Sequence, residues 1–297
     1  MKRLTLKFLI TVIFILVSFS SLFAENENLK VFVSILPQKY FAERLLGGNG
    51  TVEVLIGPGM SPHTFEPLPQ QMGKLSRSDL FFTVGIPFEK VIISRLKNLC
   101  PNLIVINTDE NIVKIPMTEH HHEESSNHHD EHEHESGLDP HFWLDPLRAL
   151  TMSENMAKAV ISIRPELKDK VEANLEEIKA DINKLDEELT QKLISFKGQT
   201  LLVFHPAFGY FANKYGMIQK AVEIEGKEPA PKQLGELIRN CRNEGIKVIF
   251  VQKQFPVSTA KTIAASIGGS VIAIDPLAED YLANLRNIAE SIANSKN

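Results

Sequence analysis

The chain has 297 residues, of which 43% are hydrophobic and 23% are charged. This composition is typical of a globular protein and excludes a collagen, a coiled coil and a disordered chain. Acidic residues (37) outnumber basic ones (32), so the chain lacks the electrostatic basis for binding nucleic acid.

The first 24 residues have the pattern of a secretory signal peptide. Basic residues open the segment, an apolar run follows from Phe8 to Phe23, and Ala24 precedes a polar stretch. The alternative is an uncleaved membrane anchor, but the apolar run is somewhat short for a span of about 20 residues. We expect export and cleavage near Ala24. Because no cysteine stands at the cleavage point, we expect a soluble periplasmic protein and not a lipoprotein.

Residues 25–163 are predicted to form a first α/β lobe. Strands alternate with helices at a spacing that indicates βαβ units and a largely parallel sheet. The expected strands are Leu29–Ile35, Thr51–Ile56, Asp79–Val84 and Leu103–Asn107, and the expected helices are Pro37–Leu46, Pro69–Arg77 and Phe88–Leu99.

One segment interrupts this alternation. Residues 119–135 hold seven histidines, seven acidic residues and no apolar residue, so they cannot bury a core and should form a loop. Imidazoles flanked by carboxylates attract divalent cations, so we interpret the loop as an auxiliary metal collector or zinc sensor. The alternative is a solvated spacer. Its histidines are His120, His121, His122, His128, His129, His132 and His134.

A long helix is predicted between the two halves of the chain. Asp145 and Pro146 have the pattern of a helix start, and this helix should run to about Ile163. Residues 164–197 then form a second helical run, from Pro165 to Phe196, with apolar residues at spacings of three and four. A helix of this length would be a stiff connector between two lobes.

Residues 198–297 repeat the α/β alternation and are predicted to form a second lobe. The expected strands are Thr200–Phe204, Gln219–Glu223, Lys247–Val251 and Ser270–Ile274, and the expected helices are Pro206–Tyr215, Pro231–Glu244, Val257–Ile267 and Tyr281–Ala293. The only cysteines, Cys100 and Cys241, fall in different lobes. We expect two buried thiols, with an interlobe disulfide as the alternative.

Three histidines remain outside the histidine-rich loop, and each stands beside a proline in a predicted turn: His63, His141 and His205. His63 and His205 follow strands, and parallel α/β sheets bind ligands beyond the carboxyl ends of their strands. Zinc prefers four nitrogen, sulfur or oxygen donors. Asp275, directly after a strand of the second lobe, is the best candidate for a fourth ligand, which would give two ligands from each lobe.

Three other carboxylates compete with Asp275. Asp145 is more simply explained as a helix cap, Glu66 is a candidate auxiliary ligand three residues after His63, and Asp139 stays open.

Four segments carry a resemblance to a known family. They are GMSPHTFEP (59–67), DPHFWLDP (139–146), FHPAFGYF (204–211) and IDPL (274–277), and GKEPAP (226–231) adds to them. In this order they resemble the cluster A-I metal-binding proteins of ABC importers, which take up zinc (ZnuA-like) or manganese. The resemblance covers essentially the whole chain after the signal segment.

The resemblance implies metal ligation by His63, His141, His205 and Asp275. It also implies two four-stranded lobes, a rigid linker helix and delivery of the metal to a membrane permease. Manganese members tend to carry glutamate at the third ligand position, where this chain has His205. Three imidazoles and one carboxylate also suit Zn²⁺ better than Mn²⁺. We therefore expect a monomeric, extracytoplasmic zinc-binding protein that is not an enzyme.

Other functions stay open at this point. A manganese- or iron-binding member of the same family is the first alternative. A secreted zinc hydrolase would need an open coordination position and a base, a role that Glu66 could take if Asp275 did not bind, but no HExxH motif is present. A surface adhesin or a metal-storage protein is a third alternative.

Overall fold

The computed structural model describes residues 28–117, 137–224, 227–255 and 257–296. The predicted signal peptide and the histidine-rich segment 119–135 therefore lie outside the described residues. Among the helices of the described part, none is both long enough and apolar enough to cross a membrane.

The first lobe contains a parallel four-stranded sheet in the order β2-β1-β3-β4. The central strand β1 is almost fully buried because its residues are nearly all apolar, whereas the edge strand β2 alternates between half-buried and exposed positions before its last two residues, which are buried. The strands are β1 (Leu29–Ile35), β2 (Gly50–Ile56), β3 (Leu80–Thr83) and β4 (Ile104–Asn107), and the helices are α2 (Leu36–Leu46), α3 (Pro69–Leu75) and α4 (Pro87–Leu99).

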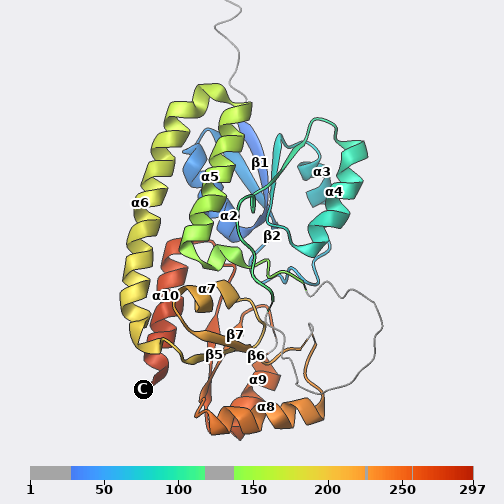
Figure 1. Ribbon diagram of the computed structural model, residues 1–297. Helices are drawn as coiled ribbons and strands as arrows, with labels where there is room; N and C mark the ends of the chain where they lie inside the picture. Colours follow the sequence, from blue (N-terminus) through green and yellow to red (C-terminus); the bar gives the residue numbers. More distant parts are fainter. Residues whose placement is uncertain (1–27, 118–136, 225–226, 256, 297) are drawn as a thin grey trace, which may run out of the picture.

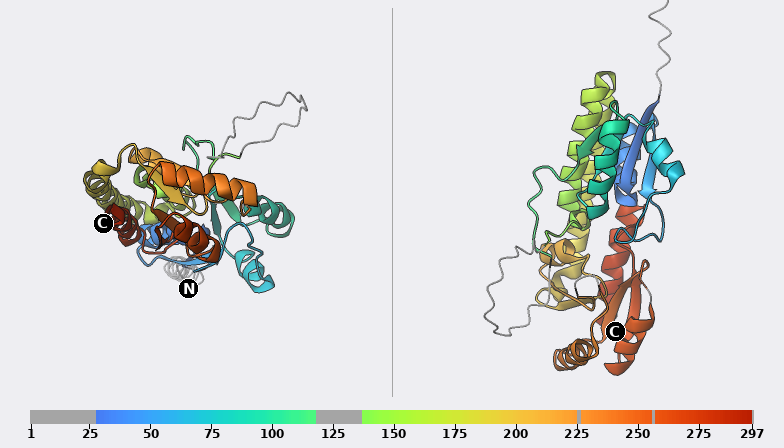
Figure 2. Two further views of the ribbon diagram at one scale, coloured as in Figure 1. Left: turned by 90° about the horizontal axis from the view of Figure 1, so that it is seen from below. Right: turned by 90° about the vertical axis from the view of Figure 1, so that its right-hand side faces the viewer.

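The second lobe repeats this arrangement with the order β6-β5-β7-β8, again with all strands parallel. Its strands are β5 (Thr200–Val203), β6 (Ile218–Ala221), β7 (Val248–Gln252) and β8 (Ser270–Ile274), and its helices are α7 (Gly209–Lys214), α8 (Pro231–Asn243), α9 (Val257–Ser266) and α10 (Tyr281–Ala293). The predicted α/β fold with two four-stranded sheets is confirmed. Figure 2 shows the two lobes at opposite ends of an elongated molecule.

Two helices join the lobes: α5 (Pro146–Ile163) and α6 (Lys168–Leu193), which has 26 residues and is therefore about 39 Å long. Figure 1 shows α6 running along one side of the molecule past both lobes. It packs against α5 and α2 at one end and against α10 at the other. The predicted helical run is not α-helical throughout, because it begins and ends with 3₁₀ turns at Pro165–Leu167 and Ile194–Phe196.

One predicted helix start was wrong. The helix expected from Pro206 begins instead at Gly209. A tight turn, in which the amide of Ala207 donates to the carbonyl of His205 over 2.7 Å, precedes it. The amide of Phe208 donates to the side chain of Gln219 over 2.6 Å. This side-chain partner satisfies an amide that would otherwise belong to the first turn of a helix.

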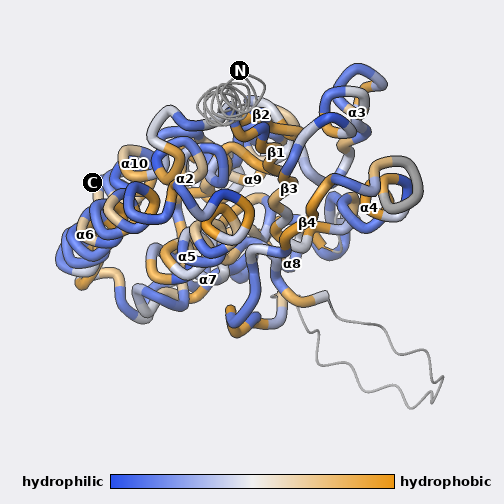
Figure 3. Tube along the Cα trace, turned by 90° about the horizontal axis from the view of Figure 1, so that it is seen from above, coloured by the Kyte–Doolittle hydropathy of each residue, from blue (hydrophilic) through white to orange (hydrophobic). Residues whose placement is uncertain are grey.

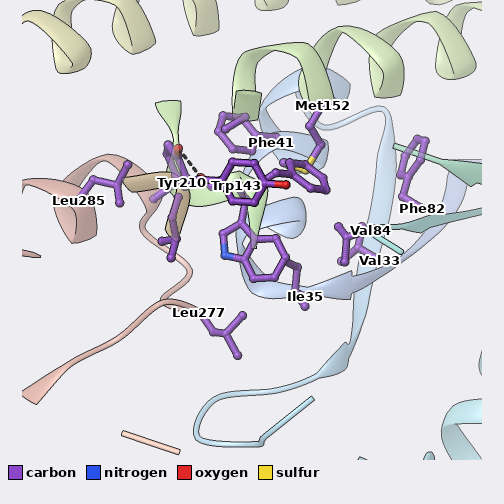
Figure 4. Close-up of a cluster of buried hydrophobic side chains, with 14 of the residues drawn as sticks. Val33, Ile35, Phe41, Phe82, Val84, Trp143, Met152, Tyr210, Leu277 and Leu285 are labelled. Atoms are coloured by element: carbon purple, nitrogen blue, oxygen red, sulfur yellow. Dashed lines mark hydrogen bonds between the residues drawn. The ribbon is translucent and has the colours of Figure 1, made fainter. Parts of the chain in front are cut away.

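The main hydrophobic core is continuous between the two lobes. Trp143 is fully buried, and Figure 4 shows it among side chains of both lobes, with Ile35 from the first and Leu277 and Leu285 from the second. Figure 3 shows hydrophobic positions gathered along the strands β1, β3 and β4 and hydrophilic ones along the outer side of α6. The lobe boundaries at residues 163 and 197 stay predictions. Both cysteines are free; Cys241 is buried and Cys100 is half-buried.

Candidate metal centre

The structure brings His63, His141 and His205 together from three separate segments. One ring nitrogen of each lies within 4.8 Å of those of the other two. The Nε2 atoms of His63 and His205 are 2.9 Å apart. Tetrahedral zinc with its usual bond lengths to nitrogen would hold such atoms about 3.3 Å apart. The three imidazoles border a cavity of about 20 Å³, which has room for one ion or one water.

His205 is held by two residues that lie beside it across the sheet. Strand β5 pairs with β6 at Val203↔Ala221 and with β7 at Val203↔Phe250. Two residues beyond each of these positions stand His205, Glu223 and Gln252, so the parallel register places the three side by side at the carboxyl ends of their strands.

The bonds of His205 follow from this register. Its Nδ1 lies 2.6 Å from Oε2 of Glu223. Gln252 accepts from the backbone amide of His205 over 3.1 Å and donates to its carbonyl over 2.6 Å. The ring of Phe255 stacks on the imidazole with the ring centroids 5.0 Å apart. His205 is buried, and both its backbone and its ring are fixed.

His141 is buried and is held by a carboxylate two residues earlier in the chain. Its Nδ1 lies 2.7 Å from Oδ1 of Asp139, and its backbone amide donates to the same oxygen over 2.9 Å. The hydroxyl of Tyr210 donates to the carbonyl of Asp139 over 2.9 Å. The segment of His141 is therefore bonded to the second lobe through α7, and also to the first lobe, because the amide of Asp139 donates to the carbonyl of Ile115 over 2.9 Å. The division of two ligands from each lobe stays a prediction.

His63 is held differently. It lies on the loop between β2 and α3, is exposed as a residue, and extends its Nε2 toward His205. The loop is anchored by Phe65, whose ring packs edge-on against Phe88 with the centroids 5.1 Å apart. Among the described residues, no carboxylate accepts a hydrogen bond from the His63 ring.

The surroundings of the imidazoles favour their neutral, metal-binding form. Desolvation, together with the nearby rings of His205 and His141, lowers the pKa of His63 to about 4. Desolvation also lowers the pKa of His205, although its hydrogen bond to Glu223 acts in the opposite direction. Neutral imidazole is the form that binds a metal ion, so these two side chains are ready to act as ligands at neutral pH.

The structure does not bring the predicted carboxylate ligands into the group of three histidines. Oδ1 of Asp275 accepts hydrogen bonds from the amide of Leu277 over 2.9 Å and from the side chain of Gln254 over 3.1 Å. Glu66 is exposed. The roles of Asp275 and Glu66 as ligands stay predictions. Asp145 caps α5 as expected, because its side chain accepts from the amide of Leu147 over 2.9 Å.

Sequence reasoning missed two residues of this site and considered a third only as a metal ligand. Glu223 and Gln252 were not identified, because only strand register brings them to His205. Asp139 was weighed only as a rival metal ligand, whereas in the structure it bonds the far side of the His141 ring. Its position two residues before a histidine was the one available signal. The seven histidines of the segment 119–135 lie outside the described residues.

The chain is similar to known proteins of zinc uptake. The model of the family described as "Zinc-uptake complex component A periplasmic" (ZnuA) matches residues 31–295. The zinc-binding protein AdcA of Streptococcus pyogenes serotype M3 is 28% identical over 285 residues, which cover 89% of this chain and 55% of AdcA. The chain thus spans about half the length of this curated relative.

Solved structures extend the comparison. The crystal structure of ZnuA matches with a TM-score of 0.83 at 32% identity, over 91% of this chain and 100% of that chain. A ZnuA deletion mutant with zinc bound matches with a TM-score of 0.82 at 33% identity, over 91% of this chain and 98% of that chain. AdcA is described as a zinc-binding protein and the matching family as a component of a zinc-uptake complex. Both descriptions agree with the prediction that the chain is not an enzyme. The chain belongs to the family of the periplasmic component A of zinc-uptake complexes.

Proposed function

We propose that this protein captures Zn²⁺ outside the cytoplasm and delivers it to the membrane permease of an ABC importer. The observation that carries the proposal is the meeting of His63, His141 and His205, whose ring nitrogens lie within 4.8 Å of one another. The family described as a zinc-uptake component and the zinc-bound structure of a 33% identical relative support the choice of metal. The N-terminal segment with the signal-peptide pattern supports an extracytoplasmic location.

The donor set favours zinc over manganese. Imidazole nitrogen suits Zn²⁺, whereas Mn²⁺ prefers oxygen-rich shells with more ligands. A site built from three imidazoles is therefore a poor match for Mn²⁺, and manganese transport is the alternative that the experiment below distinguishes.

Asp275 remains the proposed fourth ligand. It stands at the carboxyl end of β8, and the amide of Leu277 and the side chain of Gln254 both bond its Oδ1, which leaves Oδ2 as the oxygen that could bind an ion. We also propose that the histidine-rich segment 119–135 is an auxiliary collector. In support, the described residues that flank it, Met117 and Gly137, are hydrogen-bonded to each other over 3.1 Å, and Gly137 lies four positions before His141. We expect the protein to act as a monomer.

The test is a competitive titration of the protein lacking residues 1–24 with Zn²⁺ and Mn²⁺ together. A second form that also lacks residues 119–135 isolates the site formed by His63, His141 and His205. One tight zinc site that survives this deletion and is lost in His205→Ala is the expected result. Preferential manganese binding, or loss of tight binding on deletion of the segment, would contradict the proposal. In Asp275→Ala, a drop in zinc affinity would support Asp275 as a ligand and unchanged affinity would exclude it.

A further inference from the structure

Two buried carboxylates stand behind two of the three histidines. The side chain of Asp139 is 1% exposed and that of Glu223 is 7% exposed. Each accepts from the Nδ1 of a different imidazole, His141 and His205 respectively. Among the described residues, neither carboxylate forms an ion pair with a lysine or arginine.

We propose that Glu223 and Asp139 are positioning residues for metal capture: they hold His205 and His141 with the Nε2 lone pair facing the ion, and they supply the negative charge that a cation needs there. This inference rests on the proposed function, because it concerns how the same site binds zinc. It adds a role for two residues that are not themselves expected to touch the ion.

The first part of the role follows from hydrogen-bond chemistry. A carboxylate only accepts hydrogen bonds, so Nδ1 of each of these two rings must carry the proton. The neutral imidazole then has its lone pair on Nε2, the atom on the side of the histidine cluster. Without the carboxylate, the ring would exchange between two tautomers and could rotate, and both changes weaken a metal ligand.

The second part of the role is electrostatic. Three neutral imidazoles bring no charge to a divalent cation, whereas Asp139 and Glu223 together bring two negative charges one ring away. The charge of Asp139 is only partly balanced by hydrogen bonds, because its Oδ2 is buried and has no hydrogen-bond partner in the described part of the chain. A buried carboxylate oxygen without a partner is costly, and a cation on the far side of the His141 ring offsets that cost.

Both carboxylates are bonded to or belong to the second lobe. Glu223 follows β6, and the backbone of Asp139 is held from both lobes, because its carbonyl accepts from the hydroxyl of Tyr210 on α7 and its amide donates to the carbonyl of Ile115. His63 comes from the first lobe and lacks such a carboxylate among the described residues. The site is therefore divided into a preformed pair, His141 and His205, and a third imidazole that reaches them from a loop.

The experiment measures two quantities in Glu223→Gln, Glu223→Ala and Asp139→Asn. The first is zinc affinity, by competition with a chelator. The second is the tautomer of His205 and His141 in the metal-free protein, from the ring nitrogen chemical shifts in an NMR spectrum. Glu89→Gln is the matched control, because Glu89 is also a buried carboxylate but its partners are Ser34 and the amides of residues 84–86.

We expect Glu223→Ala to weaken zinc binding by about 10- to 100-fold and to mix the tautomers of His205. Glu223→Gln keeps an oxygen that accepts from Nδ1 but loses the charge, so it should preserve the tautomer and recover part of the affinity. Asp139→Asn should behave likewise at His141, and Glu89→Gln should bind zinc as the wild type does.

Two results would overturn the inference. If Glu223→Ala and Asp139→Asn are folded and bind zinc within about twofold of the wild type, or if the tautomers do not change in Glu223→Ala, the two carboxylates are structural only. If the wild type itself binds no zinc, the proposed function fails and the positioning role fails with it. The wild-type titration separates these two cases.

Discussion

The indole nitrogen of Trp143 donates a hydrogen bond to the carbonyl oxygen of Pro276 over 2.9 Å. Trp143 stands two residues after His141, and Pro276 directly follows Asp275. The hydroxyl of Tyr281 in turn donates to the carbonyl of Trp143 over 2.7 Å. The segment that presents His141 is thus fixed to the second lobe on both sides, by Tyr210 at Asp139 and by Tyr281 at Trp143.

Tyr281→Phe should lower the free energy of unfolding by about 1–3 kcal/mol, because it leaves the buried carbonyl of Trp143 without its donor and changes little else. Urea unfolding measures this difference. Tyr40→Phe is the matched control, since its ring lies 6.2 Å from that of Tyr281 but its hydroxyl is bonded to Arg44 and only half-buried. If the two substitutions lower the free energy of unfolding equally, the hydrogen bond from Tyr281 to Trp143 has no special importance for stability.

Most secondary structure was predictable because it depends on local patterns. The apolar run of β1 and the apolar stripe of α6 predict which of their residues are buried. The start of α7 was not predictable, because the side chain of Gln219, eleven residues away, takes the amide of Phe208. Local sequence holds no information on such a partner.

The same distinction applies to the site. The three histidines could be singled out because each stands in a turn beside a proline, and two follow strands. Glu223 could not, since only the register Val203↔Ala221 places it beside His205, 18 positions away in the chain. Register is a property of two paired strands, so it cannot be predicted from the sequence of either strand alone.

Gly209→Ala should disturb the metal site indirectly, by displacing the carboxylate of Asp139. A Cβ atom at residue 209 would lie 2.6 Å from Oδ2 of Asp139, which is too close for either atom to stay in place. We expect a loss of about 1–3 kcal/mol in the free energy of unfolding, together with weaker zinc binding, because the displaced carboxylate holds His141.

Gly235→Ala in α8 is the control for this substitution, because a Cβ there meets only the end of the Arg239 side chain, at 3.7 Å. Replacing a glycine inside a helix should leave zinc binding unchanged and raise stability slightly. If Gly209→Ala also leaves zinc affinity unchanged, the position of Asp139 does not matter for binding.

Zinc binding should persist at mildly acidic pH. For three imidazoles with the ordinary pKa of about 6.5, lowering the pH from 7.5 to 5.5 would weaken binding roughly 1000-fold through protonation. A lowered pKa keeps the neutral form present at lower pH. Since the pKa of His63 falls to about 4 and that of His205 is also lowered, the loss should be clearly smaller.

The measurement is a chelator competition at both pH values, corrected for protonation of the chelator. A synthetic peptide with the sequence of residues 119–135 is the control, because free histidines in a short peptide titrate near their ordinary value. If the protein loses affinity as steeply as the peptide does, the desolvation of His63 and His205 does not protect the site from protons.

Leu185→Ala should be strongly destabilising. Leu185 is completely buried on the inner face of α6, in the core that is shared by the two lobes. Truncation of such a side chain costs about 2–5 kcal/mol, depending on how far the surroundings close the cavity. The neighbouring Lys184→Ala on the exposed face should change the unfolding free energy by less than about 0.5 kcal/mol. Similar values for the two would mean that α6 contributes little to the core.

Zinc should cause only a small closure of the two lobes. Helix α6 packs against α2 and α5 at one end and α10 at the other, and Trp143 lies in a core that continues between the lobes. A large hinge motion would have to bend this helix and open that core, and a packed core resists both. X-ray scattering of the protein with and without zinc should therefore give nearly superimposable profiles. The Leu185→Ala variant, if folded, tests the cause, because a loosened core should permit a larger change. A marked compaction of the wild type on adding zinc would mean that α6 is a hinge and not a rigid connector.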